Sequence, residues 1–291
     1  MANESMQFTG RIVGANFPMD EEGRTYHVGL KAGELANYVL MVGDHSRATL
    51  LKSLLDPADF SLEYHSSRGF LTYTGMFNKT RVSIMSIGMG MAMADFAIRE
   101  MRAIVEGPLH IIRLGTCGTP GELYKLGSVI AAKQSFAITT NYDAYLPNSG
   151  LSKFVFSKPV AADDIMHKIL LGHLKEKVQS PYEAAEGTDA TADSFYGTQG
   201  RLDPRFFDAN EGLLAQILEI YPCTASLQME TFQLFHLARI GTDIRAAAAA
   251  IVVAERHRNV FLQKDELKGI ELSAGEACLK ALSEIENVEK P

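Results

Sequence analysis

Tryptophan is absent from this chain of 291 residues, and cysteine is scarce. The three cysteines, Cys117, Cys223 and Cys278, lie far apart, and none belongs to a CxxC pair or a Cys/His spacing. Those spacings are the usual sign of a structural zinc site, so the pattern argues against one. We expect a reduced, cytoplasmic protein without a bound metal.

Long hydrophobic runs are also missing. A membrane-spanning helix needs roughly 18 consecutive apolar residues. The longest candidate, IRAAAAAIVVAE at residues 244–255, is shorter and rich in alanine. The first residues show no basic stretch followed by an apolar core, which is the pattern of a secretory signal. We therefore expect a protein that is neither inserted into a membrane nor secreted.

The third absence is an excess of positive charge. The formal net charge is -7, and acidic and basic residues are interspersed along the chain. A general nucleic-acid-binding protein needs a basic face, so the charge pattern argues against that class. It does not argue against a small anionic ligand, because a few arginines suffice to build a local pocket.

Hydrophobic residues, in contrast, make up 46% of the chain, which is enough for a large buried core. Short apolar runs predict strands at 38–44, 81–90, 110–118, 127–135, 225–229 and 244–253. Amphipathic segments predict helices at 45–56, 93–106, 163–178, 205–221, 230–240 and 274–286. Such alternation is typical of an α/β fold with a largely parallel sheet and helices on its faces. No linker interrupts it, so we expect one domain, residues 25–291, after an irregular N-terminal arm, residues 1–24.

Three expected strand ends carry glycine, arginine or threonine. They are Gly43 with Arg47, Gly88 with Gly90, and Arg113 with Thr116. Ligands of such sheets bind beyond the carboxyl ends of the strands. Arg47 falls in the first turn of a helix, where free N–H groups and the helix dipole favour an anion. Arg113 interrupts an apolar strand and needs a partner, either a structural carboxylate or a ligand. The Gly-rich segment SIGMGMA lacks the dinucleotide and P-loop spacings, so phosphate or a phosphate ester is the expected ligand.

Two further segments have more than one interpretation. In FYGTQGRLD, residues 195–203, Gln199 and Arg201 are suited to read a planar polar ring and Phe195 to cover its face, but the same residue types are common in solvated turns. In LQMET, residues 227–231, Glu230 can accept hydrogen bonds from paired sugar hydroxyls or simply interact with a helix dipole.

Four motifs, in one order, make the chain similar to a known family. VGDHSR, RLGTCG, FYGTQGRLD and QMET resemble a first phosphate loop and the RIGTxG, FYxGQxRxD and EMES signatures of the nucleoside phosphorylases, and within them of the uridine phosphorylases. The match spans roughly residues 25–285. It implies a single α/β domain of the nucleoside phosphorylase-I type, with a mixed, mostly parallel, partly barrel-like central sheet flanked by helices.

Carried over position by position, the resemblance implies three subsites. The phosphate subsite consists of Gly43, Arg47, Arg68, Arg113 and Thr116. The ribose subsite consists of His27, Met229 and Glu230, and the base subsite of Phe195, Gln199, Arg201 and Arg256. His27 and Arg68 match residues that family members lend to a neighbouring subunit, which implies a homo-oligomer with a shared active site. The alternative is that both are ordinary surface residues.

The implied reaction is the reversible phosphorolysis of uridine to uracil and ribose 1-phosphate in pyrimidine salvage. Arg47 and Arg113 would act catalytically by holding phosphate against a ribose with oxocarbenium character, and Arg201 by stabilising the departing uracil. No cofactor is implied, because inorganic phosphate is the co-substrate. The alternatives are a broader nucleoside phosphorylase that accepts deoxyuridine, thymidine or purine nucleosides, a hydrolytic nucleosidase, or a non-catalytic nucleoside- or phosphate-binding relative.

Three positions depart from the family pattern. Gln228 stands where glutamate is usual, which is expected to weaken the ribose network. Glu255 stands where pyrimidine-specific members carry asparagine, and we expect it to pair with Arg256 rather than to broaden base choice. Gly69 stands where some members have a glutamate that helps to hold a monovalent cation, so no such cation is expected.

Overall fold

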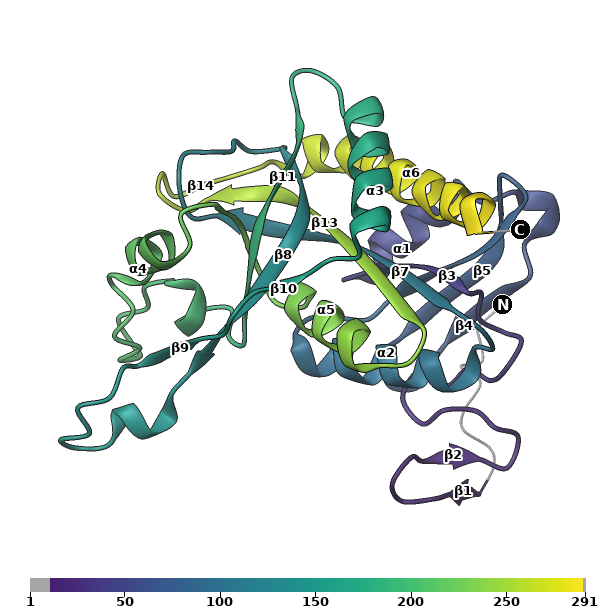
Figure 1. The fold of residues 1–291 in the computed structure, drawn as a ribbon, viewed down its shortest axis with the longest axis horizontal. Helices are drawn as coiled ribbons and strands as arrows, with labels where there is room; N and C mark the ends of the chain where they lie inside the picture. The colour runs from purple at the N-terminus through teal and green to yellow at the C-terminus, as the bar shows by residue number, and fades with distance from the viewer. Residues whose placement is uncertain (1–10, 290–291) are drawn as a thin grey trace.

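A 12-stranded mixed sheet runs through the middle of the molecule (Figure 1). The structure, a computed structural model, describes residues 11–289. Across the sheet the strands are β14 (Val260–Phe261), β13 (Ile244–Glu255), β8 (Val129–Thr140), β11 (Ala184–Ala192), β12 (Thr224–Gln228), β7 (Leu109–Thr119), β3 (Tyr38–Val42), β6 (Thr80–Ser86), β5 (Leu71–Phe77) and β4 (Leu62–His65). Two short strands, β9 (Phe154–Phe156) and β10 (Val160–Ala161), pair with β8.

Part of this sheet closes into a ring. Strand β13 pairs with both β7 and β8, and the path from β8 through β11 and β12 returns to β7. The pairs β3/β6, β3/β7, β7/β13, β8/β11 and β11/β12 are parallel, and the others in the sheet are antiparallel. The predicted α/β fold, with a mixed and partly barrel-like sheet, is confirmed.

Helices cover both faces of the sheet. Helices α1 (His45–Lys52), α3 (Asp164–Lys177) and α6 (Lys264–Glu289) pack together on one face, and α2 (Met91–Ile104) packs with α5 (Thr231–Ile240) on the other (Figure 1). Successive side chains of a strand point to opposite faces. On β3, Leu40 and Val42 therefore join the first core, and Val39 and Met41 join the second. Full burial of one such side chain contributes about 1.5–3 kcal/mol, so these short strands are anchored from both faces.

Several elements differ from the sequence prediction. Strands β4, β5 and β11 were not predicted, and β11 reads AAEGTDATA, which is too polar to stand out as an apolar run. The helix expected at 205–221 exists only as α4 (Leu213–Ile220), because residues 205–212 form an irregular loop. The helix expected at 274–286 is part of the longer α6. Of the expected arm, residues 1–10 lie outside the described residues, while β1 (Ile12–Val13) and β2 (Met19–Asp20) form a small hairpin.

The glycines of RLGTCG lie inside β7, within one residue of the predicted strand 110–118 at either end. Gly115 and Gly118 are needed there because arginine side chains pass over both of them. A Cβ on Gly115 would fall 2.0 Å from Nη1 of Arg113, and one on Gly118 would fall 3.1 Å from Cγ of Arg256. The strand thus continues through both glycines, and Arg113 lies near its middle.

Within residues 11–289, no helix is both long enough and apolar enough to cross a bilayer.

Candidate active site

A cavity of about 280 Å³ opens where β3, β6, β7, β12 and β13 end. Nine of the twelve predicted site residues line it: Gly43, Arg47, Arg113, Thr116, Phe195, Gln199, Arg201, Met229 and Glu230. The other three, His27, Arg68 and Arg256, do not line it. The cavity lining also contains residues that the motifs did not identify, among them Met89, Cys117 and Phe261.

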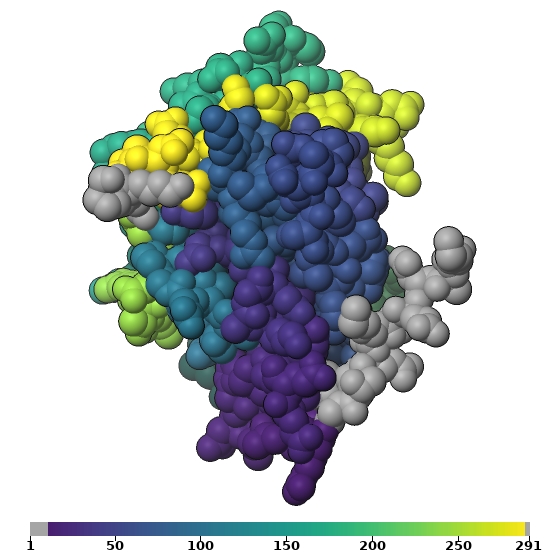
Figure 2. Space-filling model, turned by 90° about the vertical axis from the view of Figure 1, so that its right-hand side faces the viewer, coloured from purple at the N-terminus to yellow at the C-terminus, as the bar shows by residue number. Residues whose placement is uncertain are grey.

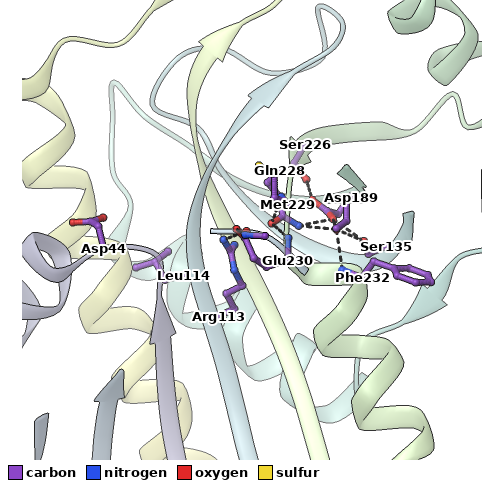
Figure 3. A network of polar contacts seen from close by, with 12 residues as sticks. Asp44, Arg113, Leu114, Ser135, Asp189, Ser226, Gln228, Met229, Glu230 and Phe232 are labelled. Atoms are coloured by element: carbon purple, nitrogen blue, oxygen red, sulfur yellow. Dashed lines mark hydrogen bonds and ion pairs between the residues drawn. The ribbon is translucent and has the colours of Figure 1, made fainter. Parts of the chain in front are cut away.

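Arg113 and Glu230, which both line the cavity, form a buried ion pair (Figure 3). One guanidinium nitrogen, Nη2, donates to Oε2 of Glu230, while the other carboxylate oxygen accepts from the backbone N–H of Gly90 at 2.7 Å. Arg113 is only 3% exposed, and its Nε and Nη1 have no hydrogen-bond partner among the described residues. The two interpretations of Arg113 therefore combine: it has a carboxylate partner and keeps two buried donors for a ligand.

Arg47 approaches the same region from the first turn of α1. The Asp44 side chain caps this helix by accepting from the backbone N–H of Arg47 at 2.9 Å. The guanidinium lies 2.7 Å from a carboxylate oxygen of Glu271 and 3.2 Å from one of Asp44. Burial acts to raise the pKa of Asp44, but the Ser46 hydroxyl and the Arg47 charge lower it below its ordinary value. Asp44 is thus a carboxylate at neutral pH. Glu271 could not be predicted as a partner of Arg47, because 224 positions separate the two residues.

These contacts set the charge of the end of the cavity that Arg47 and Arg113 line. Arg47 and Arg113 supply two positive charges, but Asp44, Glu271 and Glu230 lie in direct contact with them. One chain alone therefore offers directed N–H groups and a helix N-terminus, without an excess of positive charge.

The other end of the cavity is the segment 195–201. Its short helix η3 (Gly197–Gln199) places Gln199 in the lining at 2% exposure, and the Gln199 side chain makes no hydrogen bond within the described residues. The Arg201 guanidinium carbon lies 3.9 Å from the centroid of the Phe195 ring. The amide and the arginine are thus both available at the surface of the cavity, next to an aromatic face.

Arg256 supports this segment from outside the cavity lining. Its guanidinium donates to the backbone carbonyls of Gln199 at 2.8 Å and Gly200 at 3.1 Å. Burial and the neighbouring positive charge of Arg201 lower the pKa of Arg256 to about 10, so it remains charged at neutral pH. Neither arginine has a carboxylate partner in the part of the chain that the structure describes.

Asn210, in the loop that replaces the first half of the predicted helix 205–221, holds the same segment. Its side-chain amide nitrogen lies 3.3, 2.9 and 3.1 Å from the backbone carbonyls of Tyr196, Gly197 and Arg201. Asn210 is 4% exposed. A single buried amide therefore fixes the backbone that carries Gln199 and Arg201, a role that no motif indicated.

The expected pairing of Glu255 with Arg256 is wrong. Glu255 accepts from the backbone N–H of Leu126 at 3.0 Å and from Arg258 at 3.1 Å. Glu255 ends β13, so the next side chain points to the opposite side of the strand. The Glu255 carboxylate is consequently fixed away from the cavity.

His27 and Arg68 lie close together, away from the cavity of their own chain. Nδ1 of His27 is 2.6 Å from Oε1 of Glu100, and the ring stacks on Phe96 with centroids 4.1 Å apart. Arg68 donates to the hydroxyl of Tyr26, the residue before His27, at 2.6 Å. On the face shown in Figure 2, the N-terminal segment (purple) borders the segment from α1 to β5 (blue). The two residues thus share one surface region that can face another molecule.

Comparison with known proteins places the chain among the phosphorylases. The family model described as the phosphorylase superfamily matches residues 37–284. A uridine phosphorylase of Thermococcus kodakarensis is 31% identical over 277 residues, which is 94% of this chain and 92% of that protein. A DeoD-type purine nucleoside phosphorylase of Caldanaerobacter subterraneus is 28% identical over 221 residues, 75% of this chain and 83% of that protein.

Solved structures agree with this fold. A chain from the study of two diverse uridine phosphorylases of the oomycete Phytophthora capsici superposes with a TM-score of 0.90 at 34% identity, covering 97% of this chain and 100% of that chain. A Trypanosoma brucei nucleoside phosphorylase superposes with a TM-score of 0.78 at 20% identity, covering 92% and 99%, which supports the fold alone.

Proposed function

The chain belongs to the phosphorylase superfamily, and we propose that it catalyses the reversible phosphorolysis of uridine to uracil and ribose 1-phosphate. The observation that carries the proposal is Arg113, a buried guanidinium in the cavity with two unpartnered donors and with Glu230 fixed beside it. A buried donor without a partner costs free energy unless a ligand accepts its hydrogen bond. An anion next to a carboxylate that can accept from sugar hydroxyls matches phosphate beside ribose.

The substrates are assigned along the cavity in the order of the three subsites. Phosphate binds between the first turn of α1 and β7, at Gly43, Arg47, Arg113 and Thr116. Ribose contacts Met229 and places its 2′ and 3′ hydroxyls against Glu230. Uracil lies on Phe195, its carbonyl and N3–H groups facing Gln199 and Arg201, while Arg256 supports this segment through two backbone carbonyls.

In the forward direction, an oxygen of hydrogen phosphate attacks the anomeric carbon while the glycosidic bond breaks and its electron pair moves to N1 of uracil. The proton that the phosphate loses as it becomes an ester balances the proton that N1 takes up from solvent. Phosphate is the nucleophile, so the step requires neither a side-chain nucleophile nor a cofactor. Arg113 fixes the phosphate below the ribose, where its charge stabilises the developing oxocarbenium ion. Arg201 stabilises the negative charge on the departing base.

We further propose that the active unit is a homodimer with a shared site. The phosphate end of one chain's cavity has no excess of positive charge, because carboxylates contact both of its arginines. Arg68 of a second copy would supply the missing charge, and His27 of that copy would reach the ribose 5′-hydroxyl. Both residues lie on one surface region away from their own cavity.

The base is assigned as a pyrimidine because of Glu255. A purine leaving group is favoured by a carboxyl group that can protonate it, but Glu255 is held by Leu126 and Arg258, away from the cavity. The proposed activity belongs to pyrimidine salvage, in a reduced, cytoplasmic setting.

The test is release of free base from uridine, inosine and thymidine, each with and without phosphate. Phosphate-dependent release from uridine alone is the expected result. Release from inosine would support a broader nucleoside phosphorylase, and release without phosphate would support a nucleosidase. No release from any substrate, together with measurable uridine binding, would overturn the enzymatic proposal in favour of a sensor.

A further inference from the structure

A row of polar side chains crosses three neighbouring strands next to the cavity (Figure 3), and one of its members, Gln228, lines the cavity. At its centre is Asp189 of β11, which is 0% exposed. The carboxylate accepts from Ser135 of β8 at 2.6 Å, from Ser226 of β12 at 2.6 Å and from Thr191 of its own strand at 2.8 Å. Its fourth partner is the amide nitrogen of Gln228, at 2.7 Å.

Gln228 connects this carboxylate to the ribose subsite. Its amide nitrogen donates to Asp189, and its amide oxygen accepts from the backbone N–H groups of Met229 at 2.9 Å and Glu230 at 2.8 Å. Both N–H groups lie at the start of α5, where they have no intrahelical partner. The orientation of the amide therefore fixes the backbone from which the Met229 and Glu230 side chains enter the cavity.

An amide satisfies both contacts at once without binding a proton. A glutamate at position 228 would accept from the two N–H groups, but it would also place a second carboxylate 2.7 Å from the carboxylate of Asp189. Two carboxylates in such contact cannot both be ionised, so one of them must bind a proton. Glutamine at position 228, where the family usually has glutamate, thus suits the buried carboxylate of Asp189. The expectation that this glutamine weakens the ribose network did not take Asp189 into account.

We propose that Asp189 and Gln228 form a positioning pair, which sets the geometry of Met229 and Glu230 and thereby the recognition of the ribose 2′-hydroxyl. The part that concerns ribose rests on the proposed function. The other charged or titratable side chains close to the pair are the buried Cys117 thiol and the Arg113–Glu230 ion pair. Neither the thiol nor the ion pair forms a hydrogen bond with the Gln228 amide.

The experiment compares Gln228→Glu, Asp189→Asn and the double variant that exchanges carboxylate and amide, all in the full chain. Gln134→Glu is the matched control. It adds a carboxyl group to β8, where the Gln134 amide contacts the Thr188 hydroxyl at 3.1 Å and no carboxylate of residues 11–289. The first readout is the unfolding temperature between about pH 5 and pH 8, which does not depend on any activity.

A carboxyl group whose pKa is higher in the folded than in the unfolded state lowers the free energy of unfolding as pH rises, because ionising the group costs more in the folded state. The unfolding temperature of Gln228→Glu should therefore fall as pH rises through this range, relative to the unsubstituted chain. The double variant and Gln134→Glu should show no such fall. A flat profile for Gln228→Glu, or an equal fall in the double variant, would overturn the pairing.

The second readout is kcat/KM for uridine and 2′-deoxyuridine at saturating phosphate. Gln228→Glu should lower the preference for uridine over deoxyuridine about tenfold at pH 7.5, with partial recovery at lower pH, and the double variant should restore it. Equal losses on both nucleosides would show a merely structural role. If the unsubstituted chain is inactive on uridine, the proposed function fails, while the pH dependence of unfolding still decides whether Asp189 and Gln228 are paired.

Discussion

The guanidinium of Arg113 lies directly over the Cα of Gly115, so closely that a Cβ at position 115 would fall 2.0 Å from Nη1 and 2.7 Å from Cζ. No side chain can be added there unless the arginine moves. Arg113 is also held by Glu230 and is 3% exposed, so it has little room to move. The glycine of the RLGTCG motif is thus a spatial requirement of Arg113, the arginine proposed to bind phosphate.

Gly115→Ala should therefore reduce phosphorolysis by displacing Arg113, without removing any polar group. We expect kcat/KM for phosphate to fall by about 100-fold or more, since a misplaced group can cost that much in rate. Steady-state kinetics with varied phosphate would measure the change. Gly172→Ala in α3 is the control, because a Cβ there meets no atom within 4 Å and alanine favours a helix. Unchanged phosphate kinetics in Gly115→Ala would contradict the role of Arg113.

Gln199→Leu should lose uridine binding and keep phosphate binding. The substitution preserves the approximate size of a side chain that is 2% exposed but removes the amide assigned to the uracil edge. A buried polar group of the ligand left without a partner costs roughly 1–3 kcal/mol, which corresponds to about 5- to 150-fold in KM for uridine. Calorimetric titration with uracil and with phosphate would separate the two effects. Unchanged uracil affinity would rule out base reading by Gln199.

Asn210→Asp tests the loop that carries Gln199 and Arg201. The aspartate has the same shape, but its ionised side chain cannot donate to the carbonyls of Tyr196, Gly197 and Arg201. KM for uridine should rise by about tenfold or more while KM for phosphate changes little. Asn141→Asp is a suitable control, because Asn141 donates in the same way to one carbonyl, that of Ser152, in an exposed loop. Equal effects of both substitutions would show that Asn210 has no special role.

The part of the site that could be predicted from sequence is the part that lies within short motifs. Glycines and arginines at strand ends mark ligand loops, because the carboxyl ends of parallel strands meet at one edge of a sheet. The partners of these residues come from distant segments with no local pattern. Glu271 meets Arg47 from α6, and Asp189 meets Gln228 through strand β11, which was itself too polar to be recognised as a strand.

The predicted ion pair between Glu255 and Arg256 was wrong for a related reason. Glu255 and Arg256 are neighbours in sequence, but the alternation of side chains at the end of β13 separates them in space. Asn210 was missed because the amphipathic pattern predicted a helix there, whereas tertiary hydrogen bonds hold an irregular loop. Pairing and loop conformation depend on contacts that only the assembled fold brings together.

Glu100→Gln should impair the proposed use of His27 without touching the cavity. Glu100 is 5% exposed and accepts from the His27 and Val28 backbone N–H groups and from the His27 ring. An ionised carboxylate holds these donors more strongly than an amide does. We expect kcat/KM for uridine to fall several-fold while that for 5′-deoxyuridine, which lacks the hydroxyl assigned to His27, changes little. Equal losses on both substrates would argue that Glu100 acts only on stability.

Mixing Arg68→Ala subunits with Arg113→Ala subunits tests whether two chains share one site. Each variant alone should be nearly inactive, because every site in it lacks one phosphate-binding arginine. In a hybrid dimer with shared sites, one site carries both substitutions and the other carries neither. Random exchange of equal amounts makes about half of the dimers hybrid, so about a quarter of the normal activity should return.

The control is an equal mixture of Arg113→Ala subunits with Gly115→Ala subunits. It should recover no activity, because each of these substitutions damages the cavity of the chain that carries it. Subunit exchange must be verified separately. If exchange occurs and the first mixture recovers no activity, Arg68 does not contribute to a partner's site. The additional positive charge for phosphate must then come from another residue.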